Sequence, residues 1–356
     1  MYFYNNVVLM GYYGYSNLGD DLLFLTTLHI ISKSYVKNVF VPAPKRLKHL
    51  SDLFPDNLNV KIIDRYNPIS VIRAINRSRA TIFGGGNLFQ DETSNRSFMY
   101  YYFTAKRTLS IDHPLLLLSQ GFGPIKNPKN LQRLNSIVNS PLTSGLLRDK
   151  SSFHYASKNS NNFVLGVDYG PLFLMQNVKF STKSKDKKMA TLVLKNGIRI
   201  EEIIKQLKAN GIEKVFITGF QNHREKTLIT SSLLLAKKYK LEILENSDNW
   251  MDILKNISRS QIVITERLHG GLLSLFYGVP FIWLKGKKLN EVLSSTIDDY
   301  NLSYSSNSSK AGDMEKLISK ALQIGSLHFA SEKYQALLKE TERKTIEILN
   351  FEGCNQ

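Results

Sequence analysis

The sequence predicts an α/β protein made of two doubly wound lobes. Short runs of Val, Ile and Leu alternate with segments of helical periodicity, and this alternation occurs in two series of similar length. A polar, charged stretch at 173–188 separates the two series. Such alternation is typical of a parallel sheet with helices on both faces, and 356 residues suffice for two domains of this kind. We therefore expect two doubly wound lobes, with ligands in a cleft beyond the carboxyl ends of the strands.

The first series starts from an apolar run and continues as strand-like and helix-like segments in turn. Gly, Pro, Asn and Ser separate most of these segments, and these residue types favour turns. The strand-like segments are 5–11, 36–43, 60–64, 79–86, 114–121 and, running into a loop, 143–150. The helix-like segments are 20–32, 45–54, 69–78, 97–109 and 127–140. This series predicts a first lobe at 1–175.

The second series repeats the alternation after the charged stretch. Its strand-like segments are 189–197, 213–220, 241–245, 261–270 (ending in a loop) and 279–286. Its helix-like segments are 199–211, which ends at a glycine, 224–240, 250–260 and 272–278. A Ser-rich loop at 302–313 precedes two terminal helices. We expect a second lobe at 189–325 and a C-terminal helix at 326–356 that packs back across the lobes.

The composition indicates which partners and which cellular location to expect. The net charge of +17 favours anionic partners. The densest basic runs, 44–50 and 182–188, carry no interleaved aromatics, so nucleic-acid binding is not expected; a solvated lysine-rich surface is the alternative for each run. No stretch approaches the roughly 18 apolar residues of a membrane span, and we see no signal-peptide pattern. With Cys354 as the single cysteine, the expected location is the cytoplasm.

The first candidate motif, GYYGYSNLGDD, stands between the first strand and the first helix. Its glycine spacing differs from the dinucleotide-binding and P-loop patterns, so an ordinary dinucleotide site or NTPase is disfavoured. Gly14 and Asn17 are candidates for substrate binding, and Asp20 and Asp21 for catalysis. The alternative for either acid is a helix-capping role, which the helix dipole favours.

The second motif, GGGNLFQD, follows the fourth predicted strand. Three consecutive glycines permit positive φ angles and close approach of the backbone to an anion. A tight, closely packed turn is the alternative, but the polar residues that follow favour a binding site. The candidates for substrate binding are Gly84, Gly85, Gly86, Asn87, Gln90 and Asp91.

The third motif, LLRDKSS, offers Arg148, whose planar guanidinium suits a carboxylate or a phosphate; a surface pair with Asp149 is the alternative. The fourth, TERLHGG, places Arg267, His269 and Gly270 at an expected helix start, where an anion is favoured. A structural histidine is the alternative for His269.

Two lysines, Lys285 and Lys287, follow the next predicted strand and are further candidates for the same rim. The combined inventory of cations, a histidine and glycine turns, without a metal-ligand set, predicts a pocket for a small, multiply anionic substrate and no metal.

Taken together, the ordered motifs resemble the polysaccharide pyruvyl transferase family. The chain shows GYYGYSNLGDD, GGGNLFQD, LLRDKSS, TERLHGGLLSLFYGVP and LKGKK in the expected order, from residue 11 to residue 288. It departs from the family pattern at Asp21, where many relatives carry Glu, and at GGGN, where a fourth glycine is frequent.

The resemblance implies a glycosyltransferase-B-like fold and phosphoenolpyruvate as the donor substrate, with no further cofactor. It implies a sugar acceptor, lipid-linked or nucleotide-linked, and a pyruvate ketal as the product. In that reaction His269 would act as acid and base, while Arg148, Arg267 and a lysine near Lys285 or Lys287 hold the anionic groups. Asp20 or Asp21 would orient or deprotonate the acceptor. Peripheral contact with the anionic inner face of a membrane is a further expectation.

Two other functions remain open from the sequence. A sugar-nucleotide glycosyltransferase can use the same fold, and a non-catalytic protein that binds anionic glycans would also suit the positive charge. Phosphate release from phosphoenolpyruvate separates the first from pyruvyl transfer, and binding that survives loss of His269 would indicate the second.

Overall fold

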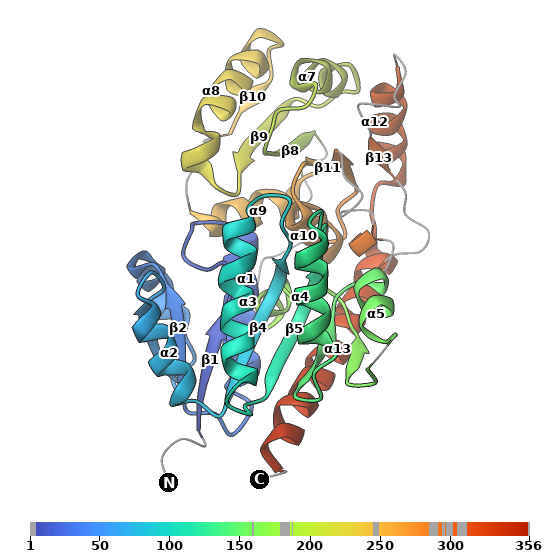
Figure 1. Ribbon diagram of the computed structural model, residues 1–356. Helices are drawn as coiled ribbons and strands as arrows, with labels where there is room; N and C mark the ends of the chain where they lie inside the picture. The colour runs from blue at the N-terminus through green and yellow to red at the C-terminus, as the bar shows by residue number, and fades with distance from the viewer. Residues whose placement is uncertain are drawn as a thin grey trace. The chain divides into compact units, whose positions relative to one another are not determined.

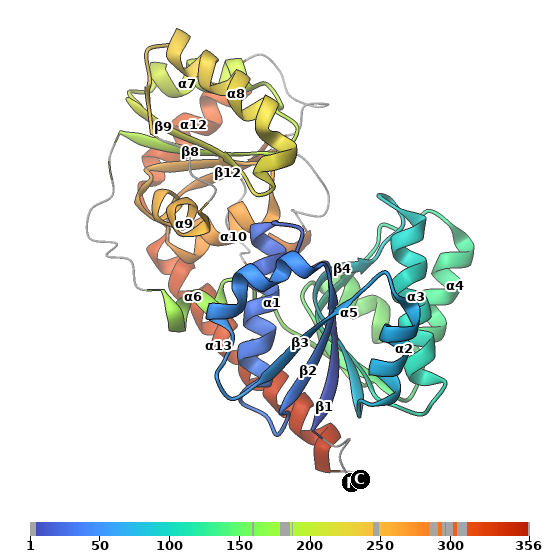
Figure 2. The same ribbon diagram turned by 90° about the vertical axis from the view of Figure 1, so that its left-hand side faces the viewer.

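A computed structural model describes residues 5–158, 160–178, 186, 188–244, 249–284, 291–293, 296, 302–304 and 312–354. The chain forms two compact units, drawn in Figures 1 and 2. Unit 1 comprises Met1–Phe173 and Leu337–Gln356, and unit 2 comprises Leu174–Ala336. The first boundary lies close to the predicted end of the first lobe at 175. The predicted C-terminal segment 326–356 is divided, because its first part belongs to unit 2 and its last part to unit 1.

Among the described residues, unit 1 contains a sheet of seven strands, and every neighbouring pair is parallel. The order places β1 between β2 and β4, so the direction of winding reverses beside β1. Open α/β sheets bind ligands at such a switch point. In sheet order the strands are β3 (Asn59–Asp64), β2 (Asn38–Ala43), β1 (Asn6–Met10), β4 (Ala80–Phe89), β5 (Leu115–Phe122), β6 (Thr143–Leu147) and β7 (Phe163–Leu165).

Helices cover both faces of this sheet (Figure 2). α2, α3 and α4 pack on one face through an apolar cluster that includes Val71, Phe98 and Leu134. The part of α13 that belongs to unit 1 lies beside α1, where Lys33 Nζ is 2.5 Å from Glu342 Oε1. The helices are α1 (Leu18–Ile31), η1 (Lys45–Leu53), α2 (Pro68–Asn76), α3 (Asn95–Leu109), α4 (Pro128–Val138), α5 (Lys150–Ala156) and the first two residues of α6 (Leu172–Asn177), whose remaining residues belong to unit 2.

Unit 2 contains, among the described residues, a second sheet of six parallel strands. All six residues of β8 are buried, as expected for a central strand covered on both faces. In sheet order the strands are β10 (Glu242–Ile243), β9 (Lys214–Gly219), β8 (Met189–Leu194), β11 (Ile262–Thr265), β12 (Phe281–Leu284) and β13 (Ser303–Tyr304).

The helices of unit 2 also lie on both faces of their sheet. α7, α8 and α12 share one apolar cluster with the strands, including Ile203, Ile229 and Ile318, and α9 and α10 pack on the other face (Figure 2). The helices are α7 (Ile200–Ala209), α8 (Asn222–Lys238), α9 (Trp250–Arg259), α10 (Leu268–Phe276), α12 (Asp313–Ile324) and α13 (His328–Cys354), which contributes to both units. The predicted fold class, two parallel α/β sheets with alternating helices, is confirmed.

Three local differences from the predicted elements have physical reasons. The helix predicted at 45–54 is the 3₁₀ helix η1, whose leucines at 47, 50 and 53 recur every third residue, the period of that helix. The strand expected at 143–150 is predicted to run into a loop, but residues 150–156 form α5 because Asp149 Oδ1 caps it by accepting the Ser152 N–H over 2.7 Å. Within the Ser-rich loop, residues 303–304 pair with β12 as the short strand β13.

Candidate active site

In each unit the motif residues gather where parallel strands end. In unit 1 they follow β1 and β6 and occupy the last part of β4 and the residues after it, and in unit 2 they follow β11. Because all neighbouring strands are parallel, these ends lie on the carboxyl edge of their own sheet.

The glycines of the first two motifs in unit 1 make room for one tyrosine. Tyr13 is buried, and its hydroxyl donates a hydrogen bond to the carbonyl oxygen of Gly84. A Cβ at Gly84 would overlap that hydroxyl, and a Cβ at Gly11 would overlap the Tyr13 ring. Close packing therefore accounts for glycine at 11 and 84 without a ligand.

Gly85 and Gly86 lie inside β4 rather than in a turn after it. They have φ angles of +77° and +94°, which side chains rarely adopt. A Cβ at Gly85 would overlap Leu23, whereas nothing lies within 4 Å of a Cβ at Gly86. Packing thus explains Gly85, and of these glycines Gly86 is the one with open space beside it.

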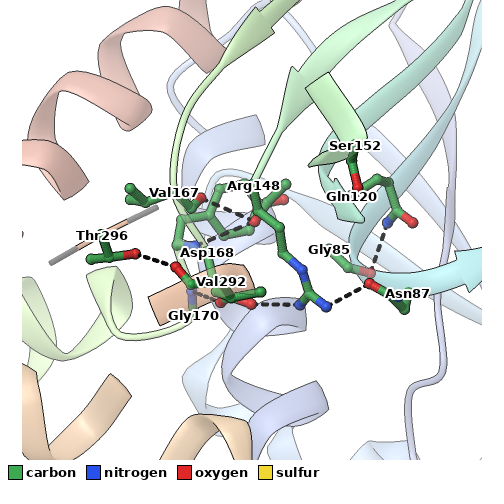
Figure 3. Close-up of polar contacts among 12 residues, drawn as sticks. Gly85, Asn87, Gln120, Arg148, Ser152, Val167, Asp168, Gly170, Val292 and Thr296 are labelled. Atoms are coloured by element: carbon green, nitrogen blue, oxygen red, sulfur yellow. Dashed lines mark hydrogen bonds and ion pairs between the residues drawn. The ribbon is translucent and has the colours of Figure 1, made fainter. Parts of the chain in front are cut away.

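Arg148 occupies the centre of a buried polar network (Figure 3). Its Nη1 donates to Asp168 Oδ2 over 2.6 Å, and its Nη2 donates to Asn87 Oδ1 over 2.6 Å. The side chains of Arg148 and Asp168 are 4% and 0% exposed. Both terminal nitrogens are therefore already engaged, a geometry that favours positioning of Asn87 over direct binding of a substrate.

The residues around this ion pair hold Asn87 from its other side. Asn87 Nδ2 donates to the Gly123 carbonyl over 2.5 Å. A Cβ at Gly121 would overlap Asn87 Oδ1, so a side chain at 121 would displace the amide. Gln120 Nε2 donates to the Gly85 carbonyl over 2.7 Å, which ties β5 to the glycine run (Figure 3).

Sequence reasoning missed Asp168, Gln120 and Gly121. The signals were present, since Asp168 follows the apolar run FVLGV, and Gln120 and Gly121 come shortly after four consecutive leucines.

Asn17, Asp20 and Asp21 lie together at the start of α1. Asn17 Nδ2 donates to Asp20 Oδ2 over 2.5 Å. Asp21 is 9% exposed. Burial and then the charge of Asp20 raise its pKa to about 7, although the Gly14 N–H and Arg46 act in the opposite direction. A carboxyl group that changes its charge near neutral pH is suited to proton transfer.

Gln90 and Asp91 fix loops. The Gln90 side chain accepts the Thr93 N–H over 3.1 Å. Asp91 accepts hydrogen bonds from the backbone of Lys126 at 2.7 Å and Asn127 at 3.0 Å. Burial acts to raise its pKa, but these hydrogen bonds, with that of Asn130, hold the pKa below its ordinary value. The contacts of both residues are those of loop anchors.

In unit 2, the acid of the TERLHGG motif organises a neighbouring loop. Glu266 is 7% exposed. It accepts hydrogen bonds from four consecutive backbone N–H groups, at 195, 196, 197 and 198, over 2.6–3.2 Å. Glu266 therefore fixes the loop between β8 and α7 against the end of β11.

Both the side chain and the backbone of Arg267 are held in place by neighbouring residues. Its guanidinium donates to Glu225 on α8, and the side chains of the pair are 14% and 4% exposed. Its backbone is anchored by Thr265, whose Oγ1 accepts the Arg267 N–H over 3.0 Å and donates to its carbonyl over 2.9 Å. Sequence reasoning missed Glu225, which lies 42 residues before its partner.

His269 is the second residue of α10 and is half-buried. The first N–H groups of a helix have no partner within that helix, so an anion is favoured beside this imidazole. Gly270 has a packing reason, because its Cβ would overlap Thr265 Oγ1. Lys285 and Lys287 lie outside the described residues.

Two properties of the described residues bear on metal binding and membrane insertion. They contain no group of three or more His, Cys, Asp or Glu side chains that could hold a metal ion. Their helices include none with the length and apolar character of a membrane span.

Comparison with solved structures shows the fold. A glycosyltransferase from Rickettsia africae is 10% identical and aligns over 100% of both chains with a TM-score of 0.60. HepE from Anabaena in complex with UDP is 10% identical over 97% of this chain and 99% of that one, with a TM-score of 0.61. UDP-GlcNAc 2-epimerase from Neisseria meningitidis bound to UDP-GlcNAc is 10% identical over 97% and 99%, with a TM-score of 0.65. The chain shares the glycosyltransferase-B-like arrangement of two Rossmann-like lobes.

Comparison at the level of sequence shows the family. No curated protein matches the sequence. A family model for polysaccharide pyruvyl transferase matches residues 17–287, which is most of the chain and includes the five motifs apart from residues 11–16 of GYYGYSNLGDD and the last residue of LKGKK. The protein is therefore a member of the polysaccharide pyruvyl transferase family.

Proposed function

We propose that the protein transfers the pyruvyl group of phosphoenolpyruvate onto a sugar of a cell-surface polysaccharide precursor. The product is a pyruvate ketal, and phosphate is released. Family membership supports transfer of a pyruvyl group. The observation that carries the proposal is the edge of the unit 2 sheet, where a fixed guanidinium and an imidazole flank the start of α10.

This edge suits the donor for electrostatic reasons. Phosphoenolpyruvate carries a phosphate and a carboxylate, and Arg267 is pre-oriented by Glu225 and Thr265 rather than free to rotate. The start of α10 adds the partial positive charge of a helix N-terminus. A rigid cation beside a helix N-terminus stabilises negative charge without reorganising during the reaction.

We assign to His269 the role of proton donor to phosphoenolpyruvate. The imidazolium gives a proton to C3 of phosphoenolpyruvate, and C2 becomes oxocarbenium-like. The oxygen of one sugar hydroxyl attacks C2 and gives its proton to a base. The C2–O bond to phosphate breaks, phosphate leaves, and a second hydroxyl attacks C2 and loses its proton to close the ketal. General acid and base catalysis of this kind contributes about 10²–10⁴-fold to a rate.

In unit 1 we assign the acceptor to the edge near Asp21. Its pKa of about 7 leaves a substantial fraction of this carboxyl group ionised at neutral pH. An ionised Asp21 is the proposed base for a sugar hydroxyl, and Asp20 and Asn17 hold the start of α1 in shape beside it.

The test uses the full-length protein with phosphoenolpyruvate and a panel of lipid-linked and nucleotide-linked sugars. We expect phosphate release that depends on an acceptor, and a product whose mass increases by one pyruvyl ketal. Release of nucleotide from a sugar nucleotide without consumption of phosphoenolpyruvate would instead indicate a glycosyltransferase. Glycan binding without turnover, unchanged in His269→Ala, would indicate a binding protein.

Peripheral attachment to a membrane is part of the same proposal. The net charge of +17 favours an anionic surface, and a lipid-linked acceptor would lie there. Sedimentation with anionic vesicles should fall as salt rises, because salt screens the attraction. Absence of binding at low salt would refute the attachment.

A further inference from the structure

Two arginines and several aromatic rings meet where β1, β2 and β3 of unit 1 end. These strands are neighbours in the sheet (Figure 2). Tyr12 and Tyr15 follow β1, Arg46 follows β2, and Arg65 and Tyr66 follow β3. We call these five residues the Tyr15 cluster. It stands at the carboxyl edge of the sheet, and the proposed chemistry has not used it.

Both arginines lie over the ring of Tyr15. Tyr12 stacks on Tyr15 with 4.3 Å between ring centroids and 12° between planes, and so covers one face. The Cζ atoms of Arg46 and Arg65 lie over the Tyr15 ring at 4.9 Å and 5.4 Å from its centroid. Both guanidinium groups therefore lie within 5.4 Å of the centre of one aromatic ring.

The two positive charges are not balanced by a salt bridge. Within the described part of the chain, neither Arg46 nor Arg65 forms an ion pair with a carboxylate. Arg65 Nη1 is buried without a hydrogen-bond partner, and its Cζ lies 4.8 Å from the centre of the Tyr100 ring. The Arg65 side chain also forms a hydrogen bond with Tyr101, which is a neutral partner. A half-buried cation without a carboxylate partner costs free energy in the folded protein, so a bound anion would stabilise this arrangement.

Arg46 is exposed and yet fixed. Its Nε donates to the Gly14 carbonyl, and within the described residues its terminal nitrogens form no hydrogen bond. Tyr66, 72% exposed, anchors the cluster through a 2.8 Å hydrogen bond between its hydroxyl and that of Tyr15. The cluster thus presents an ordered guanidinium beside an open aromatic ring.

We propose that Arg46 and Arg65 bind the diphosphate that joins the acceptor sugar to its carrier, and that Tyr66 contacts the sugar or carrier beyond it. The inference rests on the proposed function, since it names the acceptor of that reaction. Guanidinium groups bind phosphate oxygens with two parallel hydrogen bonds. Two such groups over one ring suit two linked phosphates better than a single one.

The test measures binding of inorganic pyrophosphate to the full-length protein by calorimetry, without phosphoenolpyruvate. Arg46→Gln and Arg65→Gln should each weaken binding by about tenfold or more, the scale of a lost charge-assisted hydrogen bond. Lys45→Gln is the matched control, because Lys45 is the exposed neighbour of Arg46 and carries the same charge. It should stay within about twofold of the unmodified protein.

Three results would overturn the inference. They are absence of pyrophosphate binding, unchanged binding in both arginine variants, and an equal loss in Lys45→Gln, which would indicate diffuse attraction. A fall in thermal stability of Arg46→Gln with unchanged pyrophosphate affinity would assign the arginine to loop structure alone. Because no step uses the donor, failure here is separable from failure of pyruvyl transfer.

Two further ligands distinguish the carrier, and only binding that Arg46→Gln weakens is counted. Tighter binding of farnesyl diphosphate than of pyrophosphate supports a lipid-linked acceptor, and tighter binding of UDP supports a nucleotide-linked one. Weaker binding of both than of pyrophosphate would refute a carrier-linked sugar as the ligand.

Discussion

Arg148 and Asp168 form an almost fully buried ion pair, with 2.6 Å between Nη1 and Oδ2. Asp168→Asn should lower the free energy of unfolding by about 3–5 kcal/mol, because it leaves a buried guanidinium uncompensated. Chemical denaturation measures this change. Glu213→Gln is the control, since Glu213 pairs with Lys188 in an exposed bridge whose loss should cost about 1 kcal/mol or less. Equal losses in the two variants would contradict the buried pairing.

The same pair separates two roles for Arg148. Replacing both partners with apolar residues, Arg148→Met with Asp168→Leu, removes both buried charges and should recover much of the stability lost in Asp168→Asn. If Arg148 only positions Asn87, the half-saturating concentration of phosphoenolpyruvate should change by less than about threefold in this double variant. A large rise would instead support the donor-binding role that the sequence suggested.

A second prediction about stability concerns Glu266 in unit 2. Glu266→Gln replaces one carboxylate oxygen with an NH₂ group, so the remaining oxygen can accept the N–H groups of residues 195–197 but the N–H of residue 198 loses its acceptor. We expect the free energy of unfolding to fall by about 1.5–3 kcal/mol, the scale of one hydrogen bond to a charged group. Denaturation of the variant beside Glu213→Gln measures it, and a loss no larger than that of the exposed control would refute the anchoring role.

The fold was predictable because its signals are local. Each central strand is a short apolar run bounded by turn residues, as in β8, where all six residues are buried. The three-residue period of the leucines in η1 and the Asp149 cap of α5 are also local signals, and both can be recognised in the sequence. The strand β7 was not predicted, because its three residues are too few to show the sequence pattern of a strand.

The site was only half predictable, because its partners are distant in sequence. Arg148 and Arg267 were found from their places after strands. Their carboxylate partners, Asp168 and Glu225, lie 20 and 42 residues away on other elements. A sequence shows which residues end a strand, but it does not show which loops the sheet order brings together. Packing roles such as that of Gly84 beneath Tyr13 are hidden for the same reason.

His269 is the residue on which the proposed chemistry depends most. His269→Ala should lower kcat for phosphate release by about 10²-fold or more. The half-buried side chain is small enough that the fold should persist, which circular dichroism can check. His154→Ala, at an exposed position near the end of α5, is the matched control and should keep full activity. Near-normal turnover in well-folded His269→Ala would remove this residue from the mechanism.

Asp21 makes both stability and activity depend on pH. Burial raises its pKa to about 7, well above the ordinary value of 3.8. Between those two values the folded protein keeps a proton that the unfolded chain has lost, so stability falls as pH rises through this range. One such group changes the free energy of unfolding by at most about 1.4 kcal/mol per pH unit.

Asp21→Asn should therefore reduce the loss of stability between about pH 4 and about pH 7, because an amide does not ionise. Asp52→Asn, at an exposed position, should leave that loss unchanged. If Asp21 is also the base for the acceptor, kcat of the unmodified protein should rise through about pH 7, whereas Asp21→Asn should be slow at every pH. A stability profile that Asp21→Asn does not alter would mean that the carboxyl group is already ionised in the folded protein. An unchanged rate profile would leave the acceptor hydroxyl to another base.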